Sequence, residues 1–250
     1  MFFGREELID QLSSLCRKRV ASLVTCRGRR RVGKSTLIEV FAEKNGCRFI
    51  KLEGRRPAAK LTNADELWTF VQQLSAQTNA PKAPVEDWPE AFRRLSAAIC
   101  DRSWTVVLLD EVSWLAHYDE SFADNLKIAW DNVFKKHPKL ILVVCGSVSS
   151  WIKDSIVDNP AFMGRRSLDV VVPELPLREC VKFWGKKGGP NRSARDNRRA
   201  VRDGGHPPLS RGNRSVAFCR GEHKKAVFLP ECSLADRLRR DVRGRHNGTG

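Results

Sequence analysis

Apolar residues over roughly the first three quarters of the chain follow two patterns, continuous runs of strand length and repeats with helical spacing. The runs predict strands at residues 20–26, 48–52, 104–109, 140–145 and 168–172. The repeats predict helices at residues 6–17, 34–44, 64–74, 89–99, 123–134, 150–157 and 177–183. Continuous apolar runs are typical of strands buried on both faces of a parallel sheet. The order of elements therefore predicts an α/β fold, a three-layer sandwich around a five-stranded, mainly parallel sheet.

A glycine-rich turn separates the first predicted strand from the helix that follows it. The segment Gly28-Arg29-Arg30-Arg31-Val32-Gly33-Lys34-Ser35 matches the phosphate-binding pattern G-x-x-x-x-G-K-[ST] in full. The two glycines permit backbone torsions and close approaches that a Cβ would block. Loop amides and the helix N-terminus present partial positive charges to phosphates. The pattern predicts a nucleoside triphosphate site, with ATP and Mg²⁺ as ligands.

Within this loop, each polar side chain has an expected role. Lys34 is expected to reach the β- and γ-phosphates, the Ser35 hydroxyl to bind Mg²⁺, and Thr36 to line the same site. The arginine triplet of the loop permits another interpretation, a nuclear-localisation cluster. Its position inside an intact phosphate loop between a strand and a helix favours the phosphate site.

Two acids end the strand predicted at residues 104–109. Asp110 is the expected second Mg²⁺ ligand, because P-loop ATPases hold the metal through an acid on a neighbouring strand. Glu111 is placed to orient or deprotonate an attacking water as a general base. An ordinary acidic strand end is the alternative interpretation, and the phosphate loop upstream favours the functional one.

Two further polar positions are candidates for the same site. Ser147 ends the strand at residues 140–145 and is expected to lie between the phosphate and carboxylate elements, where it would sense the γ-phosphate. The alternative is a serine that only caps the strand. Arg165 precedes the last predicted strand and is either an arginine finger for a neighbouring subunit or part of a solvated basic turn.

Composition narrows the class of protein. No apolar run approaches the roughly 18 residues of a membrane span, and the acidic start of the chain does not resemble a signal peptide. The eight cysteines include no C-x-x-C pair, which favours reduced thiols over a zinc site. We therefore expect a cytoplasmic protein without a membrane partner. The formal net charge of +16 leaves nucleic acid as a partner to consider.

The motifs in this order resemble the AAA+ ATPase family of archaea and bacteria, which is related to the STAND NTPases. The resemblance covers residues 1–187. Its motifs are Phe3-Gly4-Arg5-Glu6-Glu7-Leu8, the phosphate loop, Leu109-Asp110-Glu111, Cys145-Gly146-Ser147 with Ser150-Trp151, and Pro173-Glu174-Leu175-Pro176-Leu177. The resemblance implies a P-loop NTPase core with five strands, ATP as the nucleotide, and a position for Arg5 near the nucleotide base.

The family continues with a helical lid, and here this sequence departs from it. Residues 190–250 carry 15 Lys and Arg against 6 Asp and Glu, and contain no Trp, Tyr or Ile. One interpretation is a basic, largely irregular tail over residues 188–250 that contacts nucleic acid or an acidic partner. The other is a change of reading frame near Gly188. Back-translation around Gly205-His206-Pro207-Pro208 in a shifted reading frame permits the peptide GIPRYLEEIDPSLSAEENIKKL, which contains the family's lid motif.

These observations lead to one expected function and two alternatives. The expected function is an AAA+/STAND-type ATPase that couples ATP binding or hydrolysis to conformational change, with a homo-oligomer as a candidate assembly. The first alternative is a nucleic-acid-binding protein that ATP regulates, which the basic charge supports. The second is a small-molecule kinase, against which Glu111 and Ser147 argue.

Overall fold

The computed structural model describes residues 4–147, 150–176 and 179. The helix expected at residues 177–183 lies outside these residues apart from position 179. The basic tail and the frame change near Gly188 also lie outside them. The boundary expected between residues 187 and 188 therefore stays a prediction.

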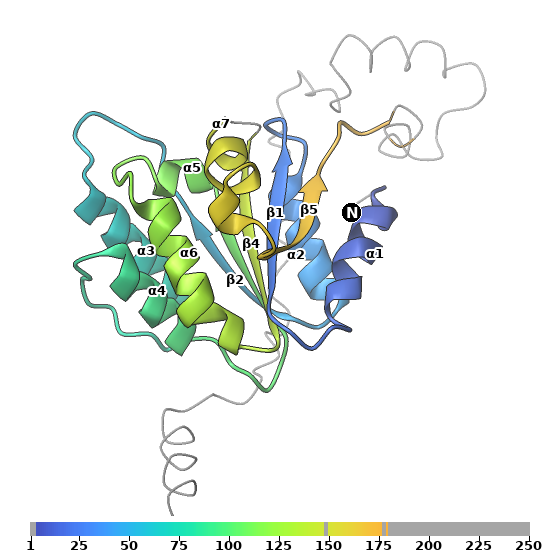
Figure 1. Ribbon diagram of the computed structural model, residues 1–250, viewed down its shortest axis with the longest axis horizontal. Helices are drawn as coiled ribbons and strands as arrows, with labels where there is room; N and C mark the ends of the chain where they lie inside the picture. Colours follow the sequence, from blue (N-terminus) through green and yellow to red (C-terminus); the bar gives the residue numbers. More distant parts are fainter. Residues whose placement is uncertain (1–3, 148–149, 177–178, 180–250) are drawn as a thin grey trace, which may run out of the picture. The chain divides into compact units, whose positions relative to one another are not determined.

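A five-stranded parallel sheet forms the centre of the fold (Figure 1). Its strands are β1 (Ser22–Gly28), β2 (Arg48–Glu53), β3 (Thr105–Asp110), β4 (Leu140–Ser147) and β5 (Arg166–Val171). They lie side by side in the order β2-β3-β4-β1-β5, and every neighbouring pair is parallel. Each strand overlaps an apolar run in the sequence, so the predicted α/β class and the five strands are confirmed.

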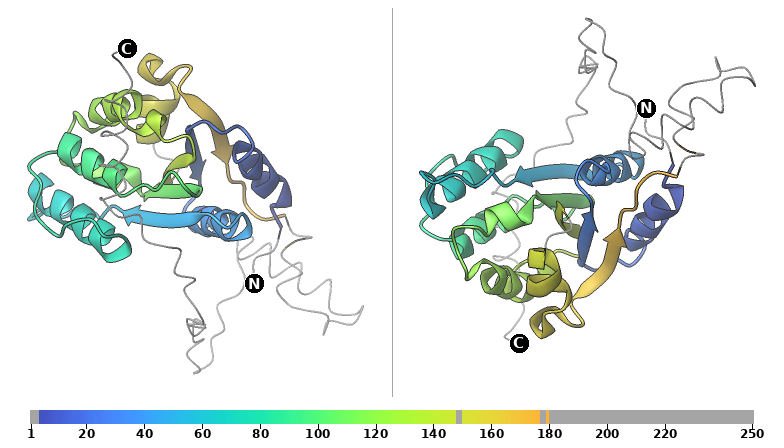
Figure 2. Two further views of the ribbon diagram at one scale, coloured as in Figure 1. Left: turned by 90° about the horizontal axis from the view of Figure 1, so that it is seen from below. Right: turned by 90° about the horizontal axis from the view of Figure 1, so that it is seen from above.

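Helices cover both faces of the sheet, which makes three layers (Figures 1 and 2). The helices α1 (Glu6–Leu15) and α2 (Lys34–Lys44) share one apolar cluster with one face of the sheet. The helices α3 (Asn63–Gln77), α4 (Trp88–Ala97) and α6 (Phe122–Asn132) pack on the other face. The period-2 alternation of strand side chains divides these two clusters.

Shorter helical segments complete the second face. They are α5 (Val112–Leu115), the 3₁₀ turn η1 (Phe134–Lys136), α7 (Ser150–Ile152), the π-turn η2 (Lys153–Val157) and the 3₁₀ turn η3 (Pro160–Phe162). Two of these differ from the sequence prediction. The helix α5 was not predicted, because four residues are too few to establish a helical period. The single helix expected at residues 150–157 is divided into an α-turn and a π-turn.

Aromatic side chains fill the core beneath α3, α4 and α6. Phe70, Trp88, Phe92, Phe122 and Phe134 are all buried. The rings of Trp88 and Phe122 meet edge to face at 4.7 Å between centroids, and those of Phe70 and Trp88 at 5.4 Å. Replacement of such a residue by Ala typically costs roughly 3–5 kcal/mol of unfolding free energy. This packing holds the sheet and its loops in one geometry.

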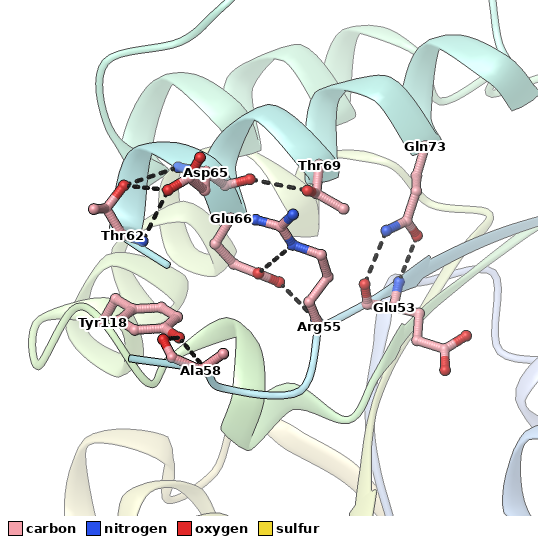
Figure 3. A network of polar contacts seen from close by, with 9 residues as sticks. All are labelled: Glu53, Arg55, Ala58, Thr62, Asp65, Glu66, Thr69, Gln73 and Tyr118. Carbon is pink, nitrogen blue, oxygen red and sulfur yellow. Dashed lines mark hydrogen bonds and ion pairs between the residues drawn. The ribbon is translucent and has the colours of Figure 1, made fainter. Parts of the chain in front are cut away.

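The outer edge of β2 is closed by two glutamine side chains of α3. The Gln77 amide accepts the Lys51 N–H at 2.9 Å and donates to the Lys51 carbonyl at 2.7 Å. The Gln73 amide makes the same pair of bonds with Glu53, at 2.7 and 2.8 Å (Figure 3). These amides replace the hydrogen bonds of a sixth strand, so the backbone of β2 is fixed on both sides.

Beyond β2, a polar network ties the next segment to α3 (Figure 3). The fully buried Glu66 accepts the Arg55 N–H at 3.0 Å. Tyr118 bonds both the N–H and the carbonyl of Ala58. Thr62 and Asp65 form a capping box that begins α3.

Among the described residues, no helix is both long and apolar enough to cross a membrane.

Candidate functional site

The predicted phosphate, metal and water-activating residues lie at the carboxyl ends of the central strands, whereas Arg165 directly precedes the amino end of β5. The strand β1 ends at Gly28, β4 at Ser147 and β3 at Asp110. Gly28 lies opposite Ser147 in the register, and β4 separates β1 from β3. Ser147 therefore lies between the phosphate loop and the acids, where the sequence placed it. Its role as a γ-phosphate sensor stays a prediction.

The phosphate loop leads directly into α2, which begins at Lys34. Gly33 adopts the left-handed conformation at φ 85°. Glycine takes up this conformation without strain, whereas a residue with a side chain would be strained there. Lys34 is 7% exposed, and its Nζ donates to the carbonyls of Gly28 at 3.1 Å and Arg29 at 3.0 Å. Its ammonium thus points back into the loop. Val32 of the loop is buried in the apolar cluster on this face.

Ser35 and Asp110 meet across two elements that are distant in sequence. The Ser35 hydroxyl donates to Asp110 Oδ2 at 2.6 Å. The other carboxylate oxygen, Oδ1, accepts the backbone N–H of Glu111 at 3.1 Å. Asp110 is buried, so its charge is stabilised mainly by these donors and by a lysine. The structure therefore brings together the two residues that the sequence assigned to a metal. Thr36, in the next position of α2, is exposed.

Glu111 has an unusual backbone and an unusual side chain. Its φ of 47° and ψ of 50° lie in the left-handed region, which a residue with a side chain rarely adopts. Its Oε2 is buried and has no hydrogen-bond partner among the described residues. Strained backbones and unpartnered polar groups cluster at functional sites. Both features support a functional assignment for Glu111 over an ordinary strand end.

The donor set of this site suits a magnesium ion that is shared with phosphates. Ser35 and Asp110 supply hard oxygen ligands, the type that Mg²⁺ prefers. In the described part of the chain, no three His, Cys, Asp or Glu side chains group closely enough to hold a metal ion. Two protein oxygens are too few for a complete magnesium site, so phosphate oxygens and water would have to supply the remaining ligands. Residues 35 and 110 therefore fit Mg²⁺ bound with a triphosphate.

One site residue was missed by the sequence analysis. Lys51 of β2 places its Nζ 3.1 Å from Asp110 Oδ2 and 2.9 Å from Glu53 Oε2. Partial burial opposes its charge, but hydrogen bonds to Glu53 and Asp110 outweigh burial and raise the pKa of Lys51. A lysine inside a predicted strand gave no signal of this contact, because the contact depends on β2 lying beside β3.

Two of the three arginines in the phosphate loop contact segments that are distant in sequence. Arg29 forms an ion pair with Glu174, which follows β5. The Arg30 guanidinium lies 5.5 Å from the ring centroid of Trp114, on the helix α5 that follows Glu111. Arg31 is exposed. None of these contacts was predicted, since each joins the loop to a segment far away in sequence.

Arg5 reaches the loop from the start of α1. Its Nη2 donates to the Pro173 carbonyl at 3.1 Å, and its Nη1 lies 3.3 Å from the position that a Cβ on Gly33 would take. Burial lowers the pKa of the Arg5 guanidinium. Its Nε is buried without a partner among the described residues. Arg5 therefore lies beside the phosphate loop. The resemblance implied a position near the nucleotide base, and that position stays a prediction.

Arg165 forms an ion pair with Asp131 of its own chain. Its guanidinium binds Asp131 of α6 through two bonds of 2.9 Å, from Nε to Oδ1 and from Nη2 to Oδ2. The hydrogen bonds from Arg165, with smaller contributions from Lys127, lower the pKa of Asp131 to about 2. The sequence gave no hint of this pair. A solvated basic turn is therefore an incomplete description of Arg165, and an arginine finger would have to leave Asp131 first.

Comparison with known proteins gives the fold but no sequence family. No protein-family model and no curated protein sequence matches the chain. The structure is similar to that of the Walker-type ATPase PABY2304 of Pyrococcus abyssi, with a TM-score of 0.53 and 19% identity over 83% of this chain. It is also similar to the Aeropyrum pernix ORC1 protein solved in complex with DNA, with a TM-score of 0.51 and 12% identity over 81% of this chain. Cdc6p from Pyrobaculum aerophilum gives a TM-score of 0.51 and 13% identity over 79% of this chain.

This chain has a P-loop NTPase fold. At these identities the likeness concerns the fold alone. The matches cover 60%, 56% and 50% of those three chains, so this chain spans little more than half of their length. What they bind or assemble with is therefore not transferred by the comparison.

Proposed function

We propose that this protein binds ATP with Mg²⁺ and hydrolyses it. The observation that carries the proposal is the contact of Ser35 with Asp110 at 2.6 Å. It joins the start of α2, which begins at Lys34, to the carboxyl end of β3, which Glu111 follows. The P-loop NTPase fold supports it, because this fold places such residues around a triphosphate.

Different residues bind the phosphates and the magnesium ion. Lys34 exchanges the carbonyls of Gly28 and Arg29 for phosphate oxygens, which are stronger acceptors for an ammonium. The loop amides and the N-terminus of α2 add fixed partial positive charge. Ser35 and Asp110 hold Mg²⁺, which when bound neutralises charge on the phosphates.

The remaining residues act on the water and the terminal phosphate. Glu111 orients the attacking water and accepts its proton. Its buried Oε2, which has no hydrogen-bond partner within the described part of the chain, supports this role. Ser147 lies beside the phosphate loop and senses the γ-phosphate. We further propose that the chain is an AAA+/STAND-type ATPase whose nucleotide state drives a change of conformation or assembly. In that assembly Arg165 would exchange Asp131 for a phosphate of a neighbouring copy.

Three variants of the full chain test the proposal. Lys34→Ala is expected to weaken ATP binding by about 10- to 100-fold, the value of a lost charged hydrogen bond. Glu111→Gln is expected to bind ATP normally and to lose turnover by about 100-fold or more. Lys44→Ala, at the far end of the same helix α2, is the matched control and should change neither. Equal phosphate release by wild type and Glu111→Gln would contradict the role of Glu111.

A second candidate function is nucleic-acid binding that ATP regulates. The net charge of +16 supports it. The measurement that separates the two functions is DNA binding by the full chain at several salt concentrations, with and without ATP. Absence of binding even at low salt would leave the ATPase as the remaining function.

A further inference from the structure

Three donors surround the carboxylate of Asp110. Oδ2 is 2.6 Å from the Ser35 hydroxyl and 3.1 Å from Lys51 Nζ, and Oδ1 accepts the N–H of Glu111. The Asp110 side chain is only 6% exposed, so a new ligand has to replace a donor that is already there. The Glu111 donor is backbone, and Ser35 is fixed in the first turn of α2. Lys51 is therefore the donor that a competing cation can displace.

The position of Lys51 is set by the sheet and does not depend on a flexible loop. Its backbone is bonded to Gln77 on one side and lies opposite Leu108 of β3 on the other. Its side chain is 36% exposed and has a second partner, Glu53, at 2.9 Å. The ammonium can therefore give up Asp110 and still keep an ion pair at the same strand.

A divalent cation that bound Asp110 would compete with Lys51 for one buried carboxylate. Both are positive, so they repel each other when both lie against Asp110, and the repulsion is strong where water is scarce. A free Mg²⁺ ion brings no negative charge that would offset this repulsion. A triphosphate does bring negative charge, and it also supplies the oxygens that complete the metal's shell.

We propose that Lys51 is a positioning residue that makes metal binding depend on nucleotide: it excludes free Mg²⁺ from Asp110, and it gives up Asp110 and keeps only its ion pair with Glu53 when nucleotide-bound Mg²⁺ arrives. The inference rests on the proposed ATP site. It explains why Mg²⁺ would bind this site together with the nucleotide and not before it. It predicts that Lys51 and Glu53 have opposite effects on the affinity for the metal. Loss of Lys51 strengthens metal binding, whereas loss of Glu53 weakens it.

The first experiment uses the metal alone. Binding of Mn²⁺ to the nucleotide-free full chain is measured by electron paramagnetic resonance for wild type, Lys51→Met and Lys60→Met. Lys51→Met is expected to bind Mn²⁺ at least about tenfold more tightly, because a like-charge contact is removed. Lys60→Met removes the same charge at an exposed position and should match wild type. Should Lys51→Met fail to fold, Lys51→Gln replaces it.

The second experiment measures the Mg²⁺ concentration that half-saturates binding of a fluorescent ATP analogue. We expect this concentration to fall in Lys51→Met, to rise in Glu53→Gln and to return to the wild-type value in Lys51→Arg. If Lys51 had only a structural role, Lys51→Met and Glu53→Gln would not shift the half-saturating Mg²⁺ concentration in opposite directions. In the double variant, the effect of Lys51→Met should dominate, since without Lys51 there is no ammonium for Glu53 to hold away from Asp110.

The outcomes separate this inference from the proposed function. If wild type binds the analogue and Lys51→Met changes neither Mn²⁺ affinity nor the Mg²⁺ requirement, the exchange is refuted and the ATP site stands. If wild type binds no nucleotide at any Mg²⁺ concentration, the proposed function itself is wrong. Tighter Mn²⁺ binding in Lys60→Met as well would also overturn the inference, because it would show an effect of net charge alone.

Discussion

Gly54 lies close to the backbone of Glu111 and of helix α5. It follows β2, and its N–H donates to the Asp110 carbonyl at 3.0 Å. A Cβ at Gly54 would lie 2.8 Å from the Glu111 carbonyl oxygen, 2.8 Å from the Leu115 nitrogen and 3.0 Å from the Trp114 Cβ. Two of these three atoms are backbone, so no side-chain rotation relieves the overlap. The variant Gly54→Ala therefore has to displace a backbone segment.

The size and direction of the displacement follow from the surroundings. Ordinary contacts of a Cβ begin at 3.4 Å, so the segment from Glu111 to Leu115 has to move by about 0.6 Å. The strand β2 is held by β3 and by the glutamines of α3, so the movement falls mainly on Glu111 and α5. Overpacking of this kind costs about 1–3 kcal/mol of unfolding free energy. A misplacement approaching 1 Å costs up to about 100-fold in turnover.

Three measurements on the full chain check this prediction. Urea unfolding followed by tryptophan fluorescence gives the stability, phosphate release gives the turnover, and a fluorescent ATP analogue gives the affinity. We expect Gly54→Ala to lose about 1–3 kcal/mol and roughly 10- to 100-fold in turnover, with little change in ATP affinity. Amide exchange of residues 111–115 should also quicken, which reports the displacement without reference to activity.

A second glycine supplies the matched control. Gly46 has a φ of +61° and open space where its Cβ would lie, at the end of α2 that is remote from the phosphate loop. Gly46→Ala is expected to lose about 1–2 kcal/mol through backbone strain and to keep full turnover. If Gly54→Ala is destabilised but hydrolyses ATP within twofold of wild type, the link between Gly54 and the placement of Glu111 is wrong.

Two further predictions concern contacts away from the proposed ATP site. Arg165 lowers the pKa of Asp131 to about 2, so this pair stabilises the fold above the ordinary carboxyl pKa near 4 and loses its effect as pH falls towards 2. The stability difference between wild type and Asp131→Asn, about 1 kcal/mol at neutral pH, should therefore shrink between pH 4 and pH 2 in urea titrations; a difference that is constant over this range would contradict it. The Ser96 hydroxyl lies 2.7 Å from His137 Nε2, and both residues are buried at the amino ends of the strands. Ser96→Ala should cost about 1–3 kcal/mol by leaving the imidazole without this bond, while ATP affinity, measured with the same fluorescent analogue, stays at the wild-type value.

Local chemistry in the sequence predicted much of the proposed ATP site. The phosphate-loop pattern gave the start of α2 at Lys34, because the spacing of its glycines and lysine works only between a strand and a helix. The apolar run before Asp110 predicted β3 and placed the acid at its end. Such signals are readable because they depend on residues close together in the chain.

Contacts between neighbouring strands had no such signal. The sequence does not show that β2 lies beside β3, and without that order Lys51 has no relation to Asp110. The pairing of Arg165 with Asp131 was hidden in the same way, since Arg165 lies in the turn before β5 and Asp131 lies 34 residues earlier, in α6. The helix α5 was missed because it is too short to show a period.

The sequence by itself determined the α/β class, the five strands and the positions of Lys34, Ser35 and Asp110, since local patterning and turn chemistry are sufficient for these. Only the tertiary structure decided which donors surround the Asp110 carboxylate, because strand order and the burial of charge are set by long-range packing. It also placed Glu111 in a left-handed backbone conformation against Gly54, a constraint created by the meeting of β2 and α5.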